Sequence, residues 1–419
     1  MSDLAPIELL RFATVGSVDD GKSTLIGRLL VDTRQLFDDQ LDAVAAASAK
    51  RGVGDLDLSF VTDGLRAERE QGITIDVAYR YATTPTRKFV IADCPGHVQY
   101  TRNMATGAST ADLALVVVDA TKGLKEQTRR HLCIAALLGV RNVIVAANKM
   151  DLADWEQEPY DRVVEQVQAL SKRLGFVDPL VIPVSALRGD NVVEPSAEAN
   201  WYEGPTVLQA LESAHAGSWS SSNSGARLPI QWVLRQHGGG RTYAGMVNGA
   251  TFHVGDEVTL LPQGITTTVR AIRSLRGNAT EAAPGLSVDL DLADDTDAGR
   301  GNMLATAPLP LVTQEIAATV CWFSDRPLTP GQRLRLKHTT QSTPARIKEI
   351  EGVLDIESLT VSPAGQIALN EIGLIHIETS EPLAVDDYRD DRVTGSFVLI
   401  DEVNNATVAA GMIGHVSLL

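Results

Sequence analysis

The sequence predicts an α/β domain over residues 1–212, followed by two smaller domains built from β-strands. Strand-like runs alternate with helical stretches in the first half, which is typical of a parallel sheet covered by helices. From Leu228 onward the helical period disappears, and short extended runs separated by Gly- and Pro-rich turns indicate antiparallel barrels or sandwiches. These changes predict a Ser- and Gly-rich linker at 213–226 and all-β domains at 227–308 and 309–419.

Individual elements follow from local apolar spacing. In the first domain, the strands are expected at 11–15, 88–92, 142–147 and 180–184. The helices are expected at 24–31, 128–138 and 160–174. In the all-β part, the plainest strands are expected at 228–234, 257–261, 266–272, 366–377 and 396–400.

A glycine-rich segment between the first strand and the first helix predicts a phosphate-binding loop. Residues 16–23 match G-x-x-x-x-G-K-[ST], in which the glycines let backbone N–H groups point at phosphate oxygens beside a helix N-terminus. Lys22 is expected to reach the β- and γ-phosphates, and the Ser23 hydroxyl to bind Mg²⁺. By itself this loop predicts a nucleoside triphosphate as the ligand.

Two later segments predict that the base is guanine. Residues 148–151, Asn-Lys-Met-Asp, follow a buried-strand run, and ligands bind at the carboxyl ends of strands in open α/β sheets. The Asp151 carboxylate can accept hydrogen bonds from guanine N1–H and the exocyclic amino group, a pair of donors that adenine lacks. Lys149 is expected to lie along the base and Asn148 to tie this loop to the phosphate loop. Ser185–Ala186 is expected to present a backbone N–H to the guanine oxygen.

Hydrolysis requires groups that contact the γ-phosphate and the attacking water. Asp93 ends a strand and is expected to hold Mg²⁺ through water, while Gly96 offers its N–H to the γ-phosphate. A neutral His97 can orient the water; a lone histidine after a strand is more often a surface or capping residue, and the preceding Asp-Cys-Pro-Gly favours catalysis. Thr74, in a segment typical of a nucleotide-dependent switch, is expected to complete the magnesium shell.

These segments, taken in order along the chain, predict a site for GTP or GDP with Mg²⁺. The predicted catalytic residues are His97, Lys22 and Thr74, and the predicted magnesium ligands are Ser23, Thr74 and Asp93. The predicted nucleotide contacts are Gly16, Ser17, Val18, Asp19, Asp20, Gly21, Lys22, Ser23, Thr24, Asp93, Cys94, Pro95, Gly96, His97, Asn148, Lys149, Met150, Asp151, Ser185, Ala186 and Leu187.

The same motifs resemble the translational GTPase class typified by elongation factor Tu. Longer strings are similar to one branch of that class, the GTPase subunits of bacterial ATP sulfurylase, also called sulfate adenylyltransferase subunit 1. Ser17, Asp20 and Ser23 follow this branch, whereas elongation factor Tu has two histidines and a threonine there. The similar strings, which span most of the chain, are 17–30, 63–76, 97–110, 128–131, 368–374 and 381–383.

This resemblance implies a GTP-binding domain followed by two antiparallel β-barrels. In that family the GTPase subunit pairs with a small catalytic subunit, which makes adenosine 5'-phosphosulfate and pyrophosphate from ATP and sulfate. The resemblance implies that GTP hydrolysis drives this uphill adenylyl transfer. Relatives fused to adenylylsulfate kinase carry a second triphosphate loop near the C-terminus; this sequence has none, so that activity is not expected.

Composition narrows the class of protein. The 419 residues, 44% hydrophobic and 21% charged, are typical of a globular protein of several domains. No apolar run approaches the roughly 18 residues of a membrane span, and the N-terminus lacks a secretory layout, so neither a membrane partner nor export is expected, and the location expected is cytoplasmic. A net charge of −16 opposes nonspecific nucleic-acid binding, so no DNA partner is expected.

The three cysteines, at 94, 133 and 321, lack metal-ligand spacing and are expected as reduced thiols, with Cys94 a packing residue.

Two other functions use the same motifs. A translation factor that delivers aminoacyl-tRNA would have the same GTPase core and barrels, but the longer strings favour the sulfurylase branch. The second alternative is a scaffold that binds GTP without hydrolysing it. The presence of Thr74 and His97 argues against this alternative.

Overall fold

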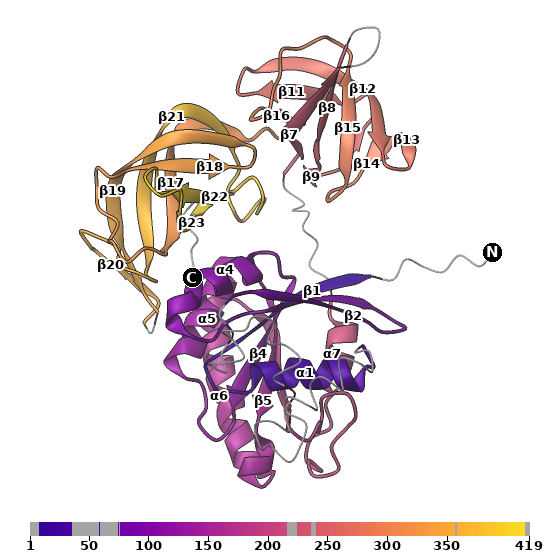
Figure 1. The fold of residues 1–419 in the computed structure, drawn as a ribbon, viewed down its shortest axis with the longest axis vertical. Coiled ribbons are helices and arrows are strands. Elements are labelled where there is room, and N and C mark those ends of the chain that lie inside the picture. Colours follow the sequence, from indigo (N-terminus) through magenta and orange to yellow (C-terminus); the bar gives the residue numbers. More distant parts are fainter. Residues whose placement is uncertain are drawn as a thin grey trace, which may run out of the picture. The chain divides into compact units, whose positions relative to one another are not determined.

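The structure is a computed structural model that describes residues 8–35, 58, 74, 76–215, 224–235, 240–356 and 358–414. The chain divides into two compact units, residues 1–217 with 418–419, and residues 218–417. Figure 1 shows the helices and strands of both units.

The first unit is a six-stranded sheet with helices on both faces, in the strand order β2-β3-β1-β4-β5-β6. All neighbouring strands are parallel except β2, which pairs antiparallel with β3. The strands are β1 (Leu9–Gly16), β2 (Ala78–Thr83), β3 (Lys88–Asp93), β4 (Leu113–Asp119), β5 (Asn142–Asn148) and β6 (Val177–Pro183). The helices are α1 (Lys22–Asp32), η2 (Val98–Tyr100), α4 (Thr101–Ser109), α5 (Glu126–Leu137), η3 (Met150–Ala153), α6 (Gln157–Leu174) and α7 (Val207–Ser213). In the described part of the chain, none of the helices has the length and apolarity to cross a bilayer.

The central strands form because their apolar runs are buried on both sides. Every residue of β4 is buried, as expected for a parallel strand covered by helices on each face. Phe12 of β1 packs edge-on against Phe89 of β3, with ring centroids 6.2 Å apart. Because β1, β3, β4 and β5 are parallel, their carboxyl ends meet at one edge of the sheet, and Gly16, Asp93, Asp119 and Asn148 end these strands there.

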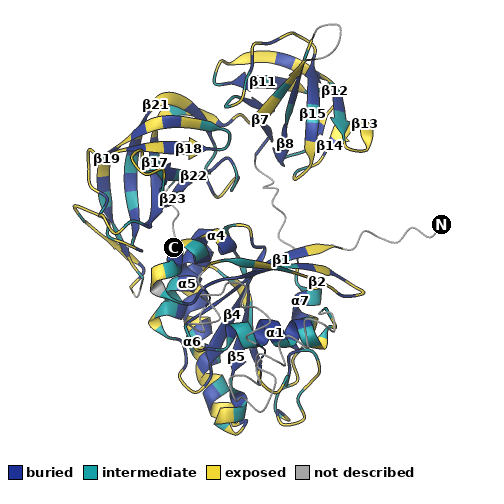
Figure 2. Ribbon diagram, viewed as in Figure 1, coloured by how far each residue is buried: buried dark blue, intermediate teal, exposed yellow. Residues whose placement is uncertain are grey.

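The second unit contains two closed antiparallel barrels of six strands each. The first ring runs β11-β16-β7-β8-β15-β12 and is closed by the pairing of β11 with β12. The second runs β18-β22-β23-β17-β21-β19 and is closed by the pairing of β18 with β19. Buried and exposed residues alternate along strands such as β18 (Figure 2), as expected when one face lines a barrel interior.

The bounds of the barrel strands are as follows. In the first barrel they are β7 (Ala226–Arg235), β8 (Arg241–Met246), β9 (Asn248–Gly249), β10 (Phe252–His253), β11 (Glu257–Leu261), β12 (Ile265–Ser274), β13 (Gly277–Ala279), β14 (Glu281–Ala282), β15 (Ser287–Leu292) and β16 (Met303–Ala305). In the second they are β17 (Leu311–Trp322), β18 (Arg333–His338), β19 (Gln341–Asp355), β20 (Thr360–Ser362), β21 (Ile372–Val385), β22 (Ser396–Ile400) and β23 (Thr407–Ile413).

A buried ion pair connects the two barrels. Arg227, only 1% exposed, donates from Nε and Nη2 to the two carboxylate oxygens of Asp386 at 3.0 and 2.9 Å. Its guanidinium also donates to the backbone oxygens of Thr306 and Pro308 in the connection between the barrels. Because the charge is fully hydrogen-bonded, it can remain buried at this junction.

The fold class expected from the sequence is confirmed, with one strand placed wrongly. The strand expected at 366–377 begins only at Ile372. Asn370 has a positive φ of 64° and donates its N–H to Trp322 O, and the Ala368 N–H donates to the Glu371 carboxylate, so these residues form a turn. The division at 1–212, 213–226, 227–308 and 309–419 stays a prediction, since 216–223 lie outside the described residues.

Candidate nucleotide site

The loop between β1 and α1 has a backbone that requires glycine. Gly16 and Gly21 have φ angles of 147° and 94°. A Cβ atom would lie 2.4 Å from the backbone oxygen of Val117 at Gly16, and 2.3 Å from Nδ2 of Asn148 at Gly21. The helix α1 begins at Lys22, immediately after Gly21, so its first N–H groups open beside the loop, as in anion-binding helix N-termini.

The side chain of Lys22 folds back onto the phosphate loop. Its Nζ donates to the backbone oxygens of Gly16 and Ser17 at 3.1 and 2.8 Å. Burial lowers the pKa of Lys22, and the nearby Asp93 carboxylate opposes that shift. A Cβ atom on Gly96 would lie 2.5 Å from Lys22 Nζ. The segment after β3 therefore lies against the phosphate loop, where the sequence predicts a contact with the γ-phosphate.

Residues from four separate parts of the chain line one hollow of about 290 Å³. The phosphate loop, Thr74, the segment after β3 and the segment after β5 all contribute to its wall. The lining residues are Val18, Asp19, Gly21, Lys22, Ser23, Thr24, Thr74, Gly96, His97 and Lys149. All of these were expected from the sequence, and the fold brings them together.

Other expected residues contribute through the backbone or from behind the hollow. Cys94 is fully buried, its Sγ faces the backbone oxygens of Ala92 and Met104, and burial raises the pKa of its thiol. Met150 is likewise buried. The side chain of Cys94 packs in the core, and all three cysteines are free. The remainder of the switch segment around Thr74, 70–73 and 75, lies outside the described residues.

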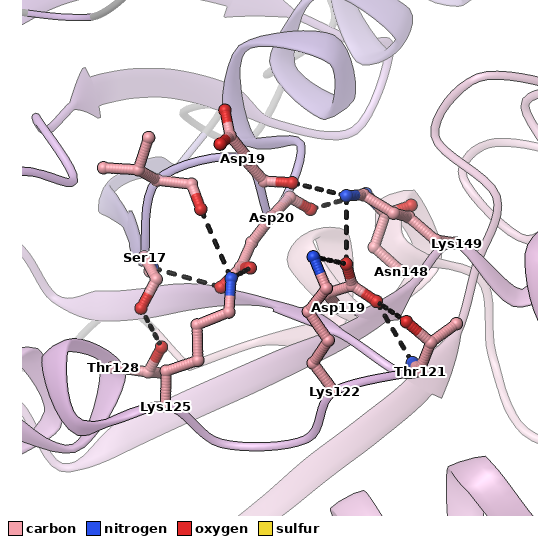
Figure 3. Close-up of polar contacts among 12 residues, drawn as sticks. Ser17, Asp19, Asp20, Asp119, Thr121, Lys122, Lys125, Thr128, Asn148 and Lys149 are labelled. Atoms are coloured by element: carbon pink, nitrogen blue, oxygen red, sulfur yellow. Dashed lines mark hydrogen bonds and ion pairs between the residues drawn. The ribbon is translucent and has the colours of Figure 1, made fainter.

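Asn148 ties the base-binding loop to the phosphate loop. Its Nδ2 donates to Asp20 O at 2.8 Å, and its Oδ1 accepts the Ala186 N–H at 2.9 Å (Figure 3 shows the first bond). Three loops therefore meet at one amide side chain. The sequence predicts that Ser185–Ala186 presents a backbone N–H to the guanine oxygen. In the structure the Ala186 N–H donates to Asn148 Oδ1 and the Ser185 N–H donates to Asp190 O, so a guanine oxygen there would share one of these donors.

The side chain of Lys149 is held in place by hydrogen bonds from its ammonium group. The residue has a φ of 67°, and its Nζ donates to Asp19 O at 2.5 Å and to the Asp119 carboxylate at 3.0 Å. The Thr121 hydroxyl donates to the other oxygen of Asp119. These bonds, foremost those from Thr121 and Lys149, hold the pKa of Asp119 below its usual range despite the opposing effect of burial. The stem of Lys149 is thus fixed where the guanine ring is expected to stack.

A set of contacts from α5 and the loop before it was not predicted from the sequence. The Gly16 N–H donates to His131 Nδ1 at 3.3 Å, and Ser17 Oγ lies 2.9 Å from Thr128 Oγ1. Burial lowers the pKa of His131 to about 3, so the ring is neutral and its Nδ1 can accept this bond. Lys125 pairs with Asp20, with its Nζ 2.5 Å from Oδ1. The spacing of Thr128 and His131 on one helix face was the available signal.

Comparisons with known proteins identify relatives of this chain. The family model "Elongation factor Tu GTP binding domain" matches residues 7–217, and "GTP-eEF1A C-terminal domain-like" matches residues 315–414. The bifunctional enzyme CysN/CysC of Mycobacterium tuberculosis is 51% identical over 97% of this chain and 67% of that relative. Sulfate adenylyltransferase subunit 1 is 48% identical in both Laribacter hongkongensis and Aeromonas salmonicida, over 97% of this chain and 85% and 86% of those relatives. A solved structure of sup35 complexed with GDP aligns over 99% of this chain and 97% of that chain, at 23% identity and with a TM-score of 0.43.

Proposed function

Because the chain belongs to the sulfate adenylyltransferase subunit 1 family, we propose that it is the GTP-hydrolysing subunit of a sulfate adenylyltransferase. The main structural support for this function is the hollow that is lined by the phosphate loop, Thr74, Gly96, His97 and Lys149. A protein that couples GTP hydrolysis to sulfate activation consumes cytoplasmic nucleotides, and the cytoplasm is its proposed location.

The proposed binding mode divides the nucleotide between two groups of residues. The phosphates lie against the N–H groups of the loop and the start of α1, with Lys22 Nζ exchanging its bonds to Gly16 and Ser17 for phosphate oxygens. The base lies beside Lys149, and Asp151, two residues further on at the start of η3, accepts from its N1–H and amino group.

The hydrolytic step requires residues around the γ-phosphate. Gly96 offers its N–H to the γ-phosphate, and His97, which lines the same hollow, orients the attacking water. Ser23 and Thr74 line that hollow, and Asp93 lies beside Lys22 closely enough to affect the pKa of the lysine. These are the hard oxygen donors that suit Mg²⁺, and we propose that they hold it. When bound, Mg²⁺ neutralises phosphate charge during phosphoryl transfer.

The base preference gives a first test. We expect Asp151→Asn to weaken GTP binding and to favour xanthosine triphosphate, because an amide donor then faces the donors of guanine but suits the carbonyl of xanthine. Competition of each nucleotide against a fluorescent GDP analogue measures the change in relative affinity for GTP and xanthosine triphosphate. Equal turnover of GTP and xanthosine triphosphate by the wild-type protein would remove Asp151 from this role.

The coupling to a partner gives a second test. The sequence has one G-x-x-x-x-G-K-[ST] loop, so we expect this chain alone to hydrolyse GTP slowly and to form no adenosine 5'-phosphosulfate. Adding the small catalytic subunit with ATP and sulfate is expected to accelerate hydrolysis and to raise product beyond the equilibrium reached without GTP. Simultaneous assays of phosphate release and adenosine 5'-phosphosulfate measure both.

Two control reactions decide what the GTP does. A nonhydrolysable GTP analogue that yields as much product as GTP would show that GTP is only an activating ligand. Acceleration by ribosomes and charged tRNA, with none by the small subunit, would assign the chain to translation instead.

A further inference from the structure

We propose that Lys125 is a positioning residue of the phosphate loop, which neutralises the buried carboxylate of Asp20 and so keeps the loop able to accept a triphosphate. This inference rests on the proposed function, since it concerns the same nucleotide site. It adds a residue from the loop before α5 that the phosphate-loop motif does not contain.

Asp20 is an unusual side chain for the place it occupies. It is 0% exposed, and both carboxylate oxygens face groups of the site: Oδ2 accepts the Ser17 N–H at 3.2 Å, and Oδ1 lies 2.5 Å from Lys125 Nζ. Lys125 Nζ also donates to Val18 O at 3.3 Å, so the lysine holds the loop at two points (Figure 3).

The charges of this region explain why the carboxylate needs a partner. A buried charge without a counter-ion is strongly unfavourable, and a triphosphate adds further negative charge beside it. Lys22 is already required by the phosphates. Lys125, with 31% of its side chain exposed, supplies the second positive charge from the rim of the loop.

The Lys125–Asp20 pair is connected to two other parts of the nucleotide site. The backbone oxygen of Asp20 accepts from Asn148, so a shift of Asp20 would also disturb the connection to the base-binding loop. On the other side, Lys125 shares a second hollow of about 360 Å³ with Gly96 and His97. Lys125 therefore lies where the phosphate loop meets the segment expected to contact the γ-phosphate.

A double-mutant cycle tests the proposal. We expect Lys125→Met to raise the Kd for GTP and GDP on the order of tenfold or more, because the Asp20 carboxylate is then left as an uncompensated buried charge beside the phosphates. Adding Asp20→Asn is expected to restore Kd to within about threefold of wild type, because the amide oxygen can still accept the Ser17 N–H and no charge is stranded. Lys125→Arg is expected to retain binding. The kcat of each variant at saturating GTP is expected to change less than its KM.

The matched control is Lys172→Met, which removes the same charge from an exposed position on α6 and is expected to leave Kd unchanged. The proposal is overturned if Lys125→Met binds GTP as wild type does, or if the double variant binds as weakly as the single one. Should Lys125→Met fail to fold, Asp20→Asn and the double variant are compared, and a tenfold difference between them would overturn it. Absence of GTP binding by wild type would refute the proposed function itself.

Discussion

Replacing Lys22 by alanine is expected to weaken GTP binding on the order of a thousandfold, because its ammonium is the charge that lies inside the loop of backbone dipoles. The Nζ atom is already positioned by the Gly16 and Ser17 oxygens and lies under Gly96. Titration with a fluorescent GTP analogue measures the loss of affinity. GDP is expected to lose less affinity, since it lacks the γ-phosphate that we propose the ammonium also contacts.

The fold is expected to survive this change. Burial lowers the pKa of Lys22, which means that the charged form is held at a cost in the free protein. Thermal unfolding without nucleotide is therefore expected to be little affected, while the stabilisation that GTP gives to wild type disappears. Lys172→Ala controls for the loss of one positive charge. GTP affinity within threefold of wild type in Lys22→Ala would refute the assignment of the phosphate loop.

Much of the site was predictable because its determinants are local. Gly16 and Gly21 are favoured by positive φ angles that arise within one turn, and a fully apolar strand such as β4 is buried wherever the sheet has helices on both faces. Parallel strands then bring their carboxyl ends together. The contact of Asn148 with the phosphate loop, expected from the motifs alone, is present in the structure.

The missed contacts depend on tertiary packing. Lys125 and Asp20 are 105 residues apart, and His131 and Gly16 are 115 apart; each pair meets only because α5 packs beside β1. The misplaced strand start at 366–377 has a similar origin. Ile367 is fully buried in the turn and forms an isolated β-bridge with Leu328. Because Ile367 packs in the barrel core, the apolar pattern typical of a strand begins in the sequence before the strand itself does.

The proposed catalytic role of His97 gives the other large expected effect. We expect His97→Ala to bind GTP with nearly wild-type affinity and to hydrolyse it about 10- to 1000-fold more slowly, as when a water-positioning group is lost. The imidazole lies in the wall of the hollow and 6.3 Å, centroid to centroid, from the ring of Tyr100, in an edge-on arrangement. Single-turnover hydrolysis at saturating GTP separates the chemical step from binding.

The comparison of His97→Ala with Lys22→Ala distinguishes catalysis from binding within one site. Lys22→Ala is expected to lose affinity, whereas His97→Ala is expected to keep affinity and to lose rate, because the imidazole is proposed to orient the water and not to bind the phosphates. In the reconstituted pair, His97→Ala is also expected to lose the extra adenosine 5'-phosphosulfate, since that gain depends on hydrolysis. Wild-type hydrolysis by His97→Ala would exclude the histidine from the mechanism, and slow hydrolysis with undiminished extra product would separate the GTPase step from adenylyl transfer.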